Sequence, residues 1–172
     1  IGSRVGWELN DLLMEHDIMD RVTMFERGIE HSRLWILNAA ADAFLLLSKA
    51  EGLCMPVVEA MACGTPVVVT DCTALKEHLY MPDGSERGFP VRSEYTYQDP
   101  WGNSYREFAD PEHAAKQLKK VFKLKQRNRL QSYIQAGREY AESRTWDKAG
   151  DVFESVIARV IAEHEQRKRL AA

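Results

Sequence analysis

Apolar runs of strand length alternate with segments of helical periodicity between residues 20 and 91. The runs D-A-F-L-L-L-S (residues 42–48) and V-V-V-T (residues 67–70) are typical of buried strands in a parallel sheet. Residues 21–25 and 88–91 predict two shorter strands. Because strands and helices alternate at short spacing, the pattern predicts an α/β fold: a Rossmann-like parallel sheet with helices on both faces.

Helices are predicted between these strands, over residues 8–16, 31–41, 56–63 and 74–79. The third has Pro56 at its first position, where the missing N–H costs little. Gly64 is expected to end it and Pro66 to begin the following strand, so we expect structural roles for both residues.

The segment from residue 93 to residue 109 interrupts this pattern, because it places five aromatic residues among polar ones. We predict a long ordered loop, whose aromatic rings either pack over the sheet edge or line an acceptor groove. Asp110, Pro111 and Glu112 then form a typical helix start. Three helices are predicted from this point on, and they end near residues 124, 143 and 169. The C-terminal tail is therefore expected to be helical.

We therefore expect a single domain over residues 1–172, with an α/β core at about 1–92, an aromatic loop at about 93–110 and a helical tail at about 111–172. The abrupt start of the chain suggests a fragment of a longer protein.

Composition narrows the possible partners. A net charge of −3 argues against nucleic acid. No run of 18 apolar residues occurs, so we expect no membrane span. Three cysteines without metal-ligand spacing suggest reduced thiols, a cytoplasmic location and no metal site. Residues 116–138 hold eight basic residues and no acid, which indicates either a solvated basic face or peripheral contact with an anionic membrane.

Two carboxylates carry the candidate chemistry. Glu51 follows the strand predicted at 42–48, and Glu59 lies eight positions later. Ligands of parallel α/β sheets bind at the carboxyl ends of the strands, where these acids are expected. A carboxylate can accept hydrogen bonds from two neighbouring hydroxyls, and the N–H groups at a helix start can hold a phosphate. The pattern favours a ligand with sugar hydroxyls and phosphates.

The stretch from residue 42 to residue 70 resembles the signature of family-four retaining glycosyltransferases, which have the GT-B fold. It reads D-A-F-L-L-L-S-K-A-E-G-L-C-M-P-V-V-E-A-M-A-C-G-T-P-V-V-V-T. The resemblance implies transfer of a sugar from a nucleoside diphosphate, such as a UDP-sugar or GDP-sugar, with retention and without a required metal or other cofactor. This chain would be the donor-binding half of such an enzyme.

The resemblance also implies residue roles. Glu51 would contact the transferred sugar as the catalytic position, and Glu59 would bind the ribose hydroxyls. Backbone amides after the first glutamate would touch sugar and diphosphate. These are the amides of Gly52, Leu53, Cys54 and Met55. Cys54 departs from the glycine that is frequent there, so its Cβ can alter sugar choice or geometry.

Other positions are less specific. Gly28 and Ile29 follow the strand predicted at 21–25 and would meet the nucleobase, or they form an ordinary strand-to-helix turn. His78 and Arg87 can reach a phosphate, but we expect both at the surface. No G-x-G-x-x-G follows a strand, which argues against a dehydrogenase.

The resemblance implies partners as well: a nucleotide sugar and an N-terminal acceptor-binding domain or partner chain. The family's acceptor domain, and its Arg and Lys that hold the diphosphate, have no counterpart in this sequence. We therefore expect weak turnover from this chain alone. The alternative is a non-catalytic sugar-nucleotide-binding module, or one subunit of a split glycosyltransferase.

Overall fold

The computed structural model describes residues 8–25 and 29–170. The chain divides into two compact units, Ile1–Leu34 and Trp35–Ala172. In the first unit, α1 (Leu9–Glu15) matches the first predicted helix. A 3₁₀ turn, η1 (Met19–Arg21), follows it. The predicted helix at 31–41 is present as α2 (His31–Ala40), which spans the boundary between the units.

The strand predicted at residues 21–25 is wrong. Arg21 ends η1, and residues 22–25 belong to no strand. Val22, Met24 and Phe25 are exposed, and no described strand pairs with this segment. An isolated extended segment gains no ladder hydrogen bonds, so β-branched and aromatic composition alone does not make it a strand.

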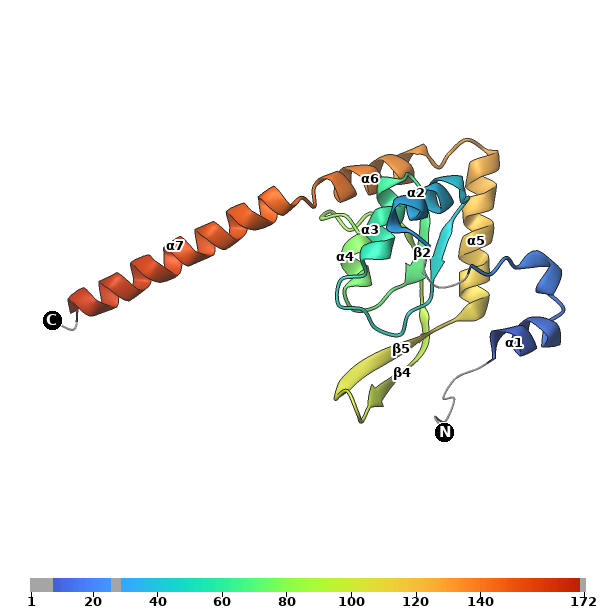
Figure 1. Cartoon of the computed structure of the whole chain (residues 1–172), viewed down its shortest axis with the longest axis horizontal. Coiled ribbons are helices and arrows are strands. Elements are labelled where there is room, and N and C mark those ends of the chain that lie inside the picture. The colour runs from blue at the N-terminus through green and yellow to red at the C-terminus, as the bar shows by residue number, and fades with distance from the viewer. Residues whose placement is uncertain (1–7, 26–28, 171–172) are drawn as a thin grey trace. The chain divides into compact units, whose positions relative to one another are not determined.

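Three parallel strands form the sheet of the second unit (Figure 1). They are β1 (Phe44–Leu46), β2 (Val67–Thr70) and β3 (Phe89–Val91), in the order β1-β2-β3. Val68 is paired with Leu45 on one side, and Val69 is paired with Pro90 on the other. The predicted parallel sheet is therefore confirmed, and β2 is its central strand.

Successive valines of β2 point to opposite faces of the sheet, and each face has its own core. Val67 and Val69 pack in a cluster with residues of α3 (Met55–Ala62) and α4 (Leu75–Leu79). Val68 packs in a second cluster with residues of β3, α5 (Pro111–Gln126) and α6 (Gln131–Glu142). Figure 1 shows α3 and α4 on one side of β2 and α5 on the other.

The apolar run at 42–48 is less covered than its composition predicts. β1 spans only three of these residues and is one of the two edge strands of the described sheet. Leu45 is 44% exposed and Leu47 is 37% exposed. The continuous apolar run predicted cover on both faces, and the described residues supply it on one face only.

The end of α3 follows the prediction closely. Gly64 has a φ of 81°, the left-handed conformation that favours glycine after a helix. The Gly64 amide donates to the carbonyl of Met61, and the Thr65 amide donates to that of Ala60. These two bonds make a Schellman motif. The Thr65 hydroxyl donates to the carbonyl of Asn38 at 2.6 Å, so this threonine also has a structural role.

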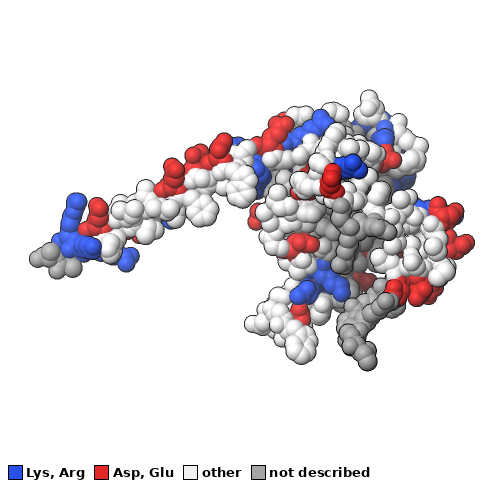
Figure 2. Space-filling model, viewed as in Figure 1, with Lys and Arg blue, Asp and Glu red and all other residues white. Residues whose placement is uncertain are grey.

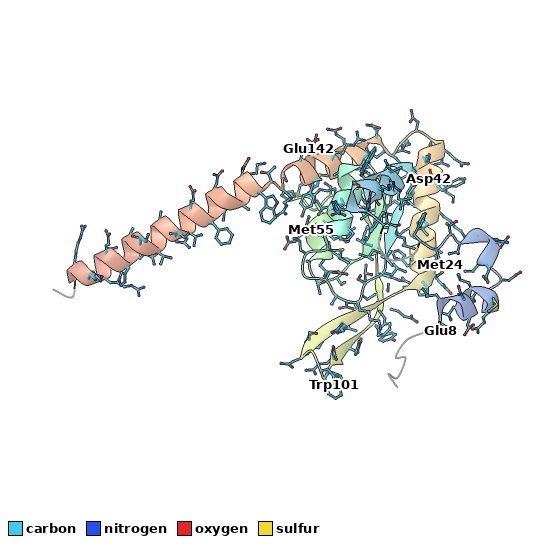
Figure 3. All side chains as sticks on the ribbon, viewed as in Figure 1. Glu8, Met24, Asp42, Met55, Trp101 and Glu142 are labelled. Carbon is cyan, nitrogen blue, oxygen red and sulfur yellow. The ribbon has the colours of Figure 1, made fainter. Side chains whose placement is uncertain are left out.

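The long loop predicted at 93–109 is instead a β-hairpin. β4 (Ser93–Asp99) and β5 (Ser104–Ala109) pair antiparallel. Cross-strand partners explain the difference, because Tyr95 stacks on Phe108 with ring centroids 4.5 Å apart. At the other end, Arg106 pairs with Asp99 at 2.7 Å. Trp101 lies at the hairpin tip and is 96% exposed (Figure 3).

The C-terminal tail is helical as predicted. Asp110 caps α5 by accepting a hydrogen bond from the amide of His113, and it forms an ion pair with Arg92 at 2.6 Å. These hydrogen bonds lower the pKa of Asp110. α6 packs on α3, where Gly137 permits close approach to Met61.

The last helix, α7 (Trp146–Leu170), has no buried residue. Figure 2 shows acidic side chains along one edge of α7 and uncharged ones along the other. Within residues 8–25 and 29–170, no helix is both long and apolar enough to cross a membrane.

The two-sided core predicts different effects for two phenylalanines. Phe89 is fully buried and stacks on Tyr133 at 4.5 Å, whereas Phe122 is 61% exposed on α5. We expect Phe89→Ala to lower the free energy of unfolding by about 3–5 kcal/mol through lost burial and a new cavity. Phe122→Ala, the matched control, should change it by less than about 1 kcal/mol. Urea unfolding measures both, and equal losses would contradict this description of the core.

Candidate functional site

The loops that follow two neighbouring strands lie at the same edge of the sheet. β1 and β2 are adjacent and parallel, so their carboxyl ends meet there. Residues 47–54 leave β1 and lead into α3, while residues 71–74 leave β2 and lead into α4. We call residues 51–55 the glutamate loop. It lies at the edge where ligands of parallel α/β sheets bind.

Hydrogen bonds within the β1–α3 connection, from the loop after β2 and from β5 hold the glutamate loop and the residues before it. The Ser48 hydroxyl donates to Oε1 of Glu51 at 2.6 Å, which fixes the half-buried carboxylate. The Glu51 amide donates to Oγ1 of Thr73 at 2.9 Å, across from the loop after β2. The amide of Glu107 in the hairpin donates to the carbonyl of Lys49 at 2.8 Å. Glu51 is thus held by its backbone and by its side chain.

The loop turns into α3 through an unusual backbone conformation. Cys54, the residue before the helix, has a φ of 63° and a ψ of 65°, which is left-handed. For a residue with a Cβ, this conformation costs about 1–2 kcal/mol. Glycine adopts it without this cost, so the geometry accounts for the glycine that is frequent at this position but does not explain Cys54. Burial raises the pKa of the Cys54 thiol, and the negative charge of Glu51 adds to the shift.

Four backbone amides of the glutamate loop, those of residues 52–55, have no acceptor among the residues that the structure describes. A Cβ built on Gly52 would meet no atom within 4 Å, so the loop borders open space. Unpaired N–H groups that face open space are suited to an anionic ligand.

The second predicted acid lies in the helix that this loop begins. Glu59 is in the second turn of α3, and its side chain is half-buried. Glu51 is half-buried as well, so neither carboxyl group is sealed inside the domain. Their roles toward a ligand stay predictions. Among the described residues, no group of three or more His, Cys, Asp or Glu could hold a metal ion.

A largely apolar hollow of about 390 Å³ borders the same loop. Leu53 and Met55 contribute side chains that are each 52% exposed, and Met55 marks the start of α3 in Figure 3. His78 and Tyr140 contribute from α4 and α6.

The structure does not test the two predicted nucleobase contacts, Gly28 and Ile29. Gly28 lies outside the described residues. Ile29 is half-buried in the first compact unit, whereas the glutamate loop belongs to the second. Both assignments therefore stay predictions.

The expectation of surface positions for His78 and Arg87 is wrong. His78 is 1% exposed and Arg87 is 8% exposed. For His78 the sequence holds a signal, because Leu75, His78 and Leu79 share one face of a short helix at helical spacing. Thr73 was also missed, since its φ of 40° and its bond to Glu51 depend on contacts distant in sequence.

Comparison with known proteins finds a glycosyltransferase family and two curated relatives. The family "Glycosyl transferases group 1" matches residues 7–84. The chain is 36% identical over 74 residues to O-antigen chain mannosyltransferase B of Escherichia coli, covering 42% of this chain and 19% of that protein. It is 35% identical over 71 residues to O-antigen chain mannosyltransferase RfbU of Salmonella typhimurium, covering 41% of this chain and 20% of that protein.

A solved structure shows the same fold. Sucrose-phosphate synthase from Thermosynechococcus elongatus superposes with a TM-score of 0.66 at 24% identity, covering 88% of this chain and 34% of that one. The predicted resemblance and the predicted Rossmann-like fold, one half of a GT-B architecture, are confirmed. The chain spans about a fifth of the curated relatives it matches.

The anchored loop predicts a specific effect of Thr73. Thr73→Val keeps the β-branched shape but removes the acceptor for the Glu51 amide, so we expect a loss of about 0.5–1.5 kcal/mol in the free energy of unfolding. Hydrogen exchange of the Glu51 amide should also accelerate. Thr73→Ser retains the hydroxyl and is the control. If the Glu51 amide exchanges at the same rate in the Val and Ser variants, the anchor is not the one described.

Proposed function

We propose that this chain, whose residues 7–84 match the family "Glycosyl transferases group 1", is the donor-binding half of an enzyme that transfers a sugar, with retention, from a nucleoside diphosphate to an acceptor. One observation carries the proposal: the glutamate loop combines an anchored carboxylate, Glu51, with a run of backbone amides that have no described acceptor. A diphosphate needs donors, and a sugar needs acceptors for its hydroxyls. The loop offers both at the edge of the sheet.

In the proposed arrangement, Glu51 contacts the transferred sugar and Glu59 accepts from the two ribose hydroxyls. The amides of residues 52–55 donate to the sugar and the diphosphate. Leaving-group charge is then stabilised by fixed N–H dipoles that need no reorganisation during the reaction, and no metal is required. The names of two relatives make mannose the first sugar to test, attached to UDP or GDP.

Glycosyl transfer also needs a place for the acceptor, and exposed apolar side chains support a covering domain or chain. Leu45 and Leu47 are exposed at the edge strand. α7 adds a second exposed apolar set: Val152, Phe153, Val156, Ile157, Val160 and Ile161. Contiguous apolar surface of this kind marks an interaction site. We propose that an acceptor-binding domain or a partner chain covers it.

The exposed apolar side chains also favour the alternative, in which this chain binds a sugar nucleotide but is not a complete enzyme. A sugar-nucleotide-binding module, or one subunit of a split glycosyltransferase, would bind the donor without transferring the sugar by itself. Transfer that appears only after a second chain is added would distinguish the split enzyme from the module.

Glu59 provides the test of donor binding. We expect wild-type protein to bind UDP or GDP and their mannose derivatives, and Glu59→Gln to weaken binding by roughly 10- to 100-fold through the loss of a charged acceptor for two hydroxyls. Calorimetry measures both affinities. Glu139→Gln, on the exposed face of α6, is the matched control and should bind as the wild type does. Equal affinity of wild type and Glu59→Gln would refute the role of Glu59.

A basic surface supports a further part of the proposal, peripheral contact with an anionic membrane in the cytoplasm. α5 ends near Arg127, so the basic segment is two helices and not one. A surface hollow of about 420 Å³ on α5 is lined by Lys116, Lys119, Lys120, Lys123, Leu124 and Arg127. The thiols of Cys54, Cys63 and Cys72 are free, which accords with a reducing compartment.

Vesicle sedimentation tests this contact. Vesicles with anionic headgroups should retain the protein at low salt and release it as ionic strength rises, because each lysine near the surface contributes about 1 kcal/mol. Replacing Lys119 and Lys123 by Glu should abolish retention. Replacing Lys148 and Lys168 of α7 in the same way should not. Retention that is independent of these α5 lysines would exclude α5 as the contact.

A further inference from the structure

His78 makes two buried contacts that link the glutamate loop to α6. Its Nε2 contacts the carbonyl oxygen of Leu53, and its Nδ1 lies 2.9 Å from the Tyr140 hydroxyl. A carbonyl oxygen only accepts hydrogen bonds, so Nε2 must carry the hydrogen. With Nδ1 accepting from the Tyr140 hydroxyl, the imidazole is in the Nε2–H tautomer.

The remaining partners fit this assignment. Arg144 donates from Nη2 to the Tyr140 hydroxyl at 2.9 Å, which leaves the tyrosine hydrogen free to point at Nδ1 of His78. Every bond then runs in one direction, from Arg144 through Tyr140 and His78 to the carbonyl of Leu53. Hydrogen bonds in such a chain strengthen one another.

Two guanidinium groups hold the tyrosine in place. The Arg87 Cζ lies 4.0 Å from the centroid of the Tyr140 ring, and the Arg144 Cζ lies 4.6 Å from it. Arg87 also donates to the carbonyls of Glu77 and His78, at 3.0 and 3.3 Å. The buried arginine therefore fixes the backbone of α4 and the ring that orients His78.

The contact between His78 and the Leu53 carbonyl also sets the direction of the next N–H, that of Cys54, because both groups belong to one peptide bond. The carbonyl of Leu53 and the amide of Cys54 belong to one planar trans peptide, so they point in opposite directions. Holding the carbonyl against buried His78 turns the Cys54 N–H away from the interior. No described group accepts from that N–H, and Cys54 itself has a left-handed φ of 63°.

We propose that His78 is a positioning residue that aims the amide of Cys54 at the diphosphate of the donor. The inference rests on the proposed function for the ligand, but the orientation of the peptide stands on the contacts of His78 alone. His78 touches no substrate atom in this arrangement. It acts through the carbonyl of Leu53, and Tyr140 and Arg144 act through His78.

Substitutions of His78 distinguish the effect of its hydrogen bond to Leu53 from the effect of filling the space. Glutamine places its amide nitrogen near the position of Nε2 and can donate to Leu53, whereas asparagine places it near Nδ1 and cannot. Leucine fills the space without a donor. We expect His78→Leu and His78→Asn to weaken binding of UDP or GDP by roughly 10- to 100-fold. Binding of the parent nucleosides, which lack phosphate, should change by less than about threefold. His78→Gln should restore the diphosphate affinity to within about threefold of wild type.

Equal affinities of the Gln and Asn variants for UDP or GDP would overturn the proposal. This comparison tests the proposal even if the Leu variant fails to fold. Equal weakening of nucleoside and diphosphate binding would also overturn it, since that outcome indicates a general structural role. Urea unfolding of each variant shows that the affinities compare folded proteins.

Nuclear magnetic resonance tests the orientation without a ligand. Long-range ¹⁵N–¹H spectra of the wild type should show hydrogen on Nε2 and none on Nδ1 of His78. The ¹³C shift of the Leu53 carbonyl should move in His78→Asn and stay near the wild-type value in His78→Gln. The opposite tautomer or an unmoved carbonyl would refute the positioning role. If these signals behave as expected but wild-type protein binds no nucleotide, the proposed function fails instead.

Discussion

The anchoring of residues 51–55 is the constraint on which the proposed site depends. This loop begins at a sheet edge and contributes little apolar surface to the core, because Leu53 and Met55 are half exposed. Its conformation is held by hydrogen bonds to Ser48, Thr73 and His78. Ser48 precedes the loop in the same connection, Thr73 lies in the loop after β2, and His78 lies in α4. A loop that is fixed from several directions can hold its N–H groups toward a ligand, whereas a freely moving loop can turn them toward acceptors of its own.

This arrangement connects the core to the chemistry. The valines of β2 hold the sheet between two apolar layers, and the sheet fixes where β1 and β2 end. Because those ends are fixed, Thr73 can reach the amide of Glu51 across the gap between neighbouring strands. The strained backbone at Cys54 and Thr73 is compensated by these contacts, and strain of this kind is common where a ligand is held. Preorganised donors are the form of catalysis that a leaving diphosphate needs.

The sequence predicts elements well wherever local signals agree. The Gly64 cap, the valine strand at β2 and the Asp110 start of α5 each combine a turn or cap residue with a clear apolar pattern, and each prediction is confirmed. The failures have one physical origin. Whether residues 22–25 form a strand, and whether residues 93–109 form a hairpin, depends on a pairing partner that local composition does not specify. The Tyr95–Phe108 stack joins residues that only the folded hairpin brings together.

The candidate site was predicted in part for the same reason. Residue spacing indicates Glu51 and the loop after it, because a sheet topology alone places that loop at the ligand edge. The groups that fix the loop, Thr73 and the chain from Tyr140 to His78, act across 22 to 62 positions of sequence.

The measurement that tests the account most directly is an amide NMR titration of the protein with UDP or GDP. The account predicts that the largest shifts fall on the amides of residues 52–55, with little change along the lysine face of α5. Shifts confined to α5, with the glutamate loop unmoved, would contradict it.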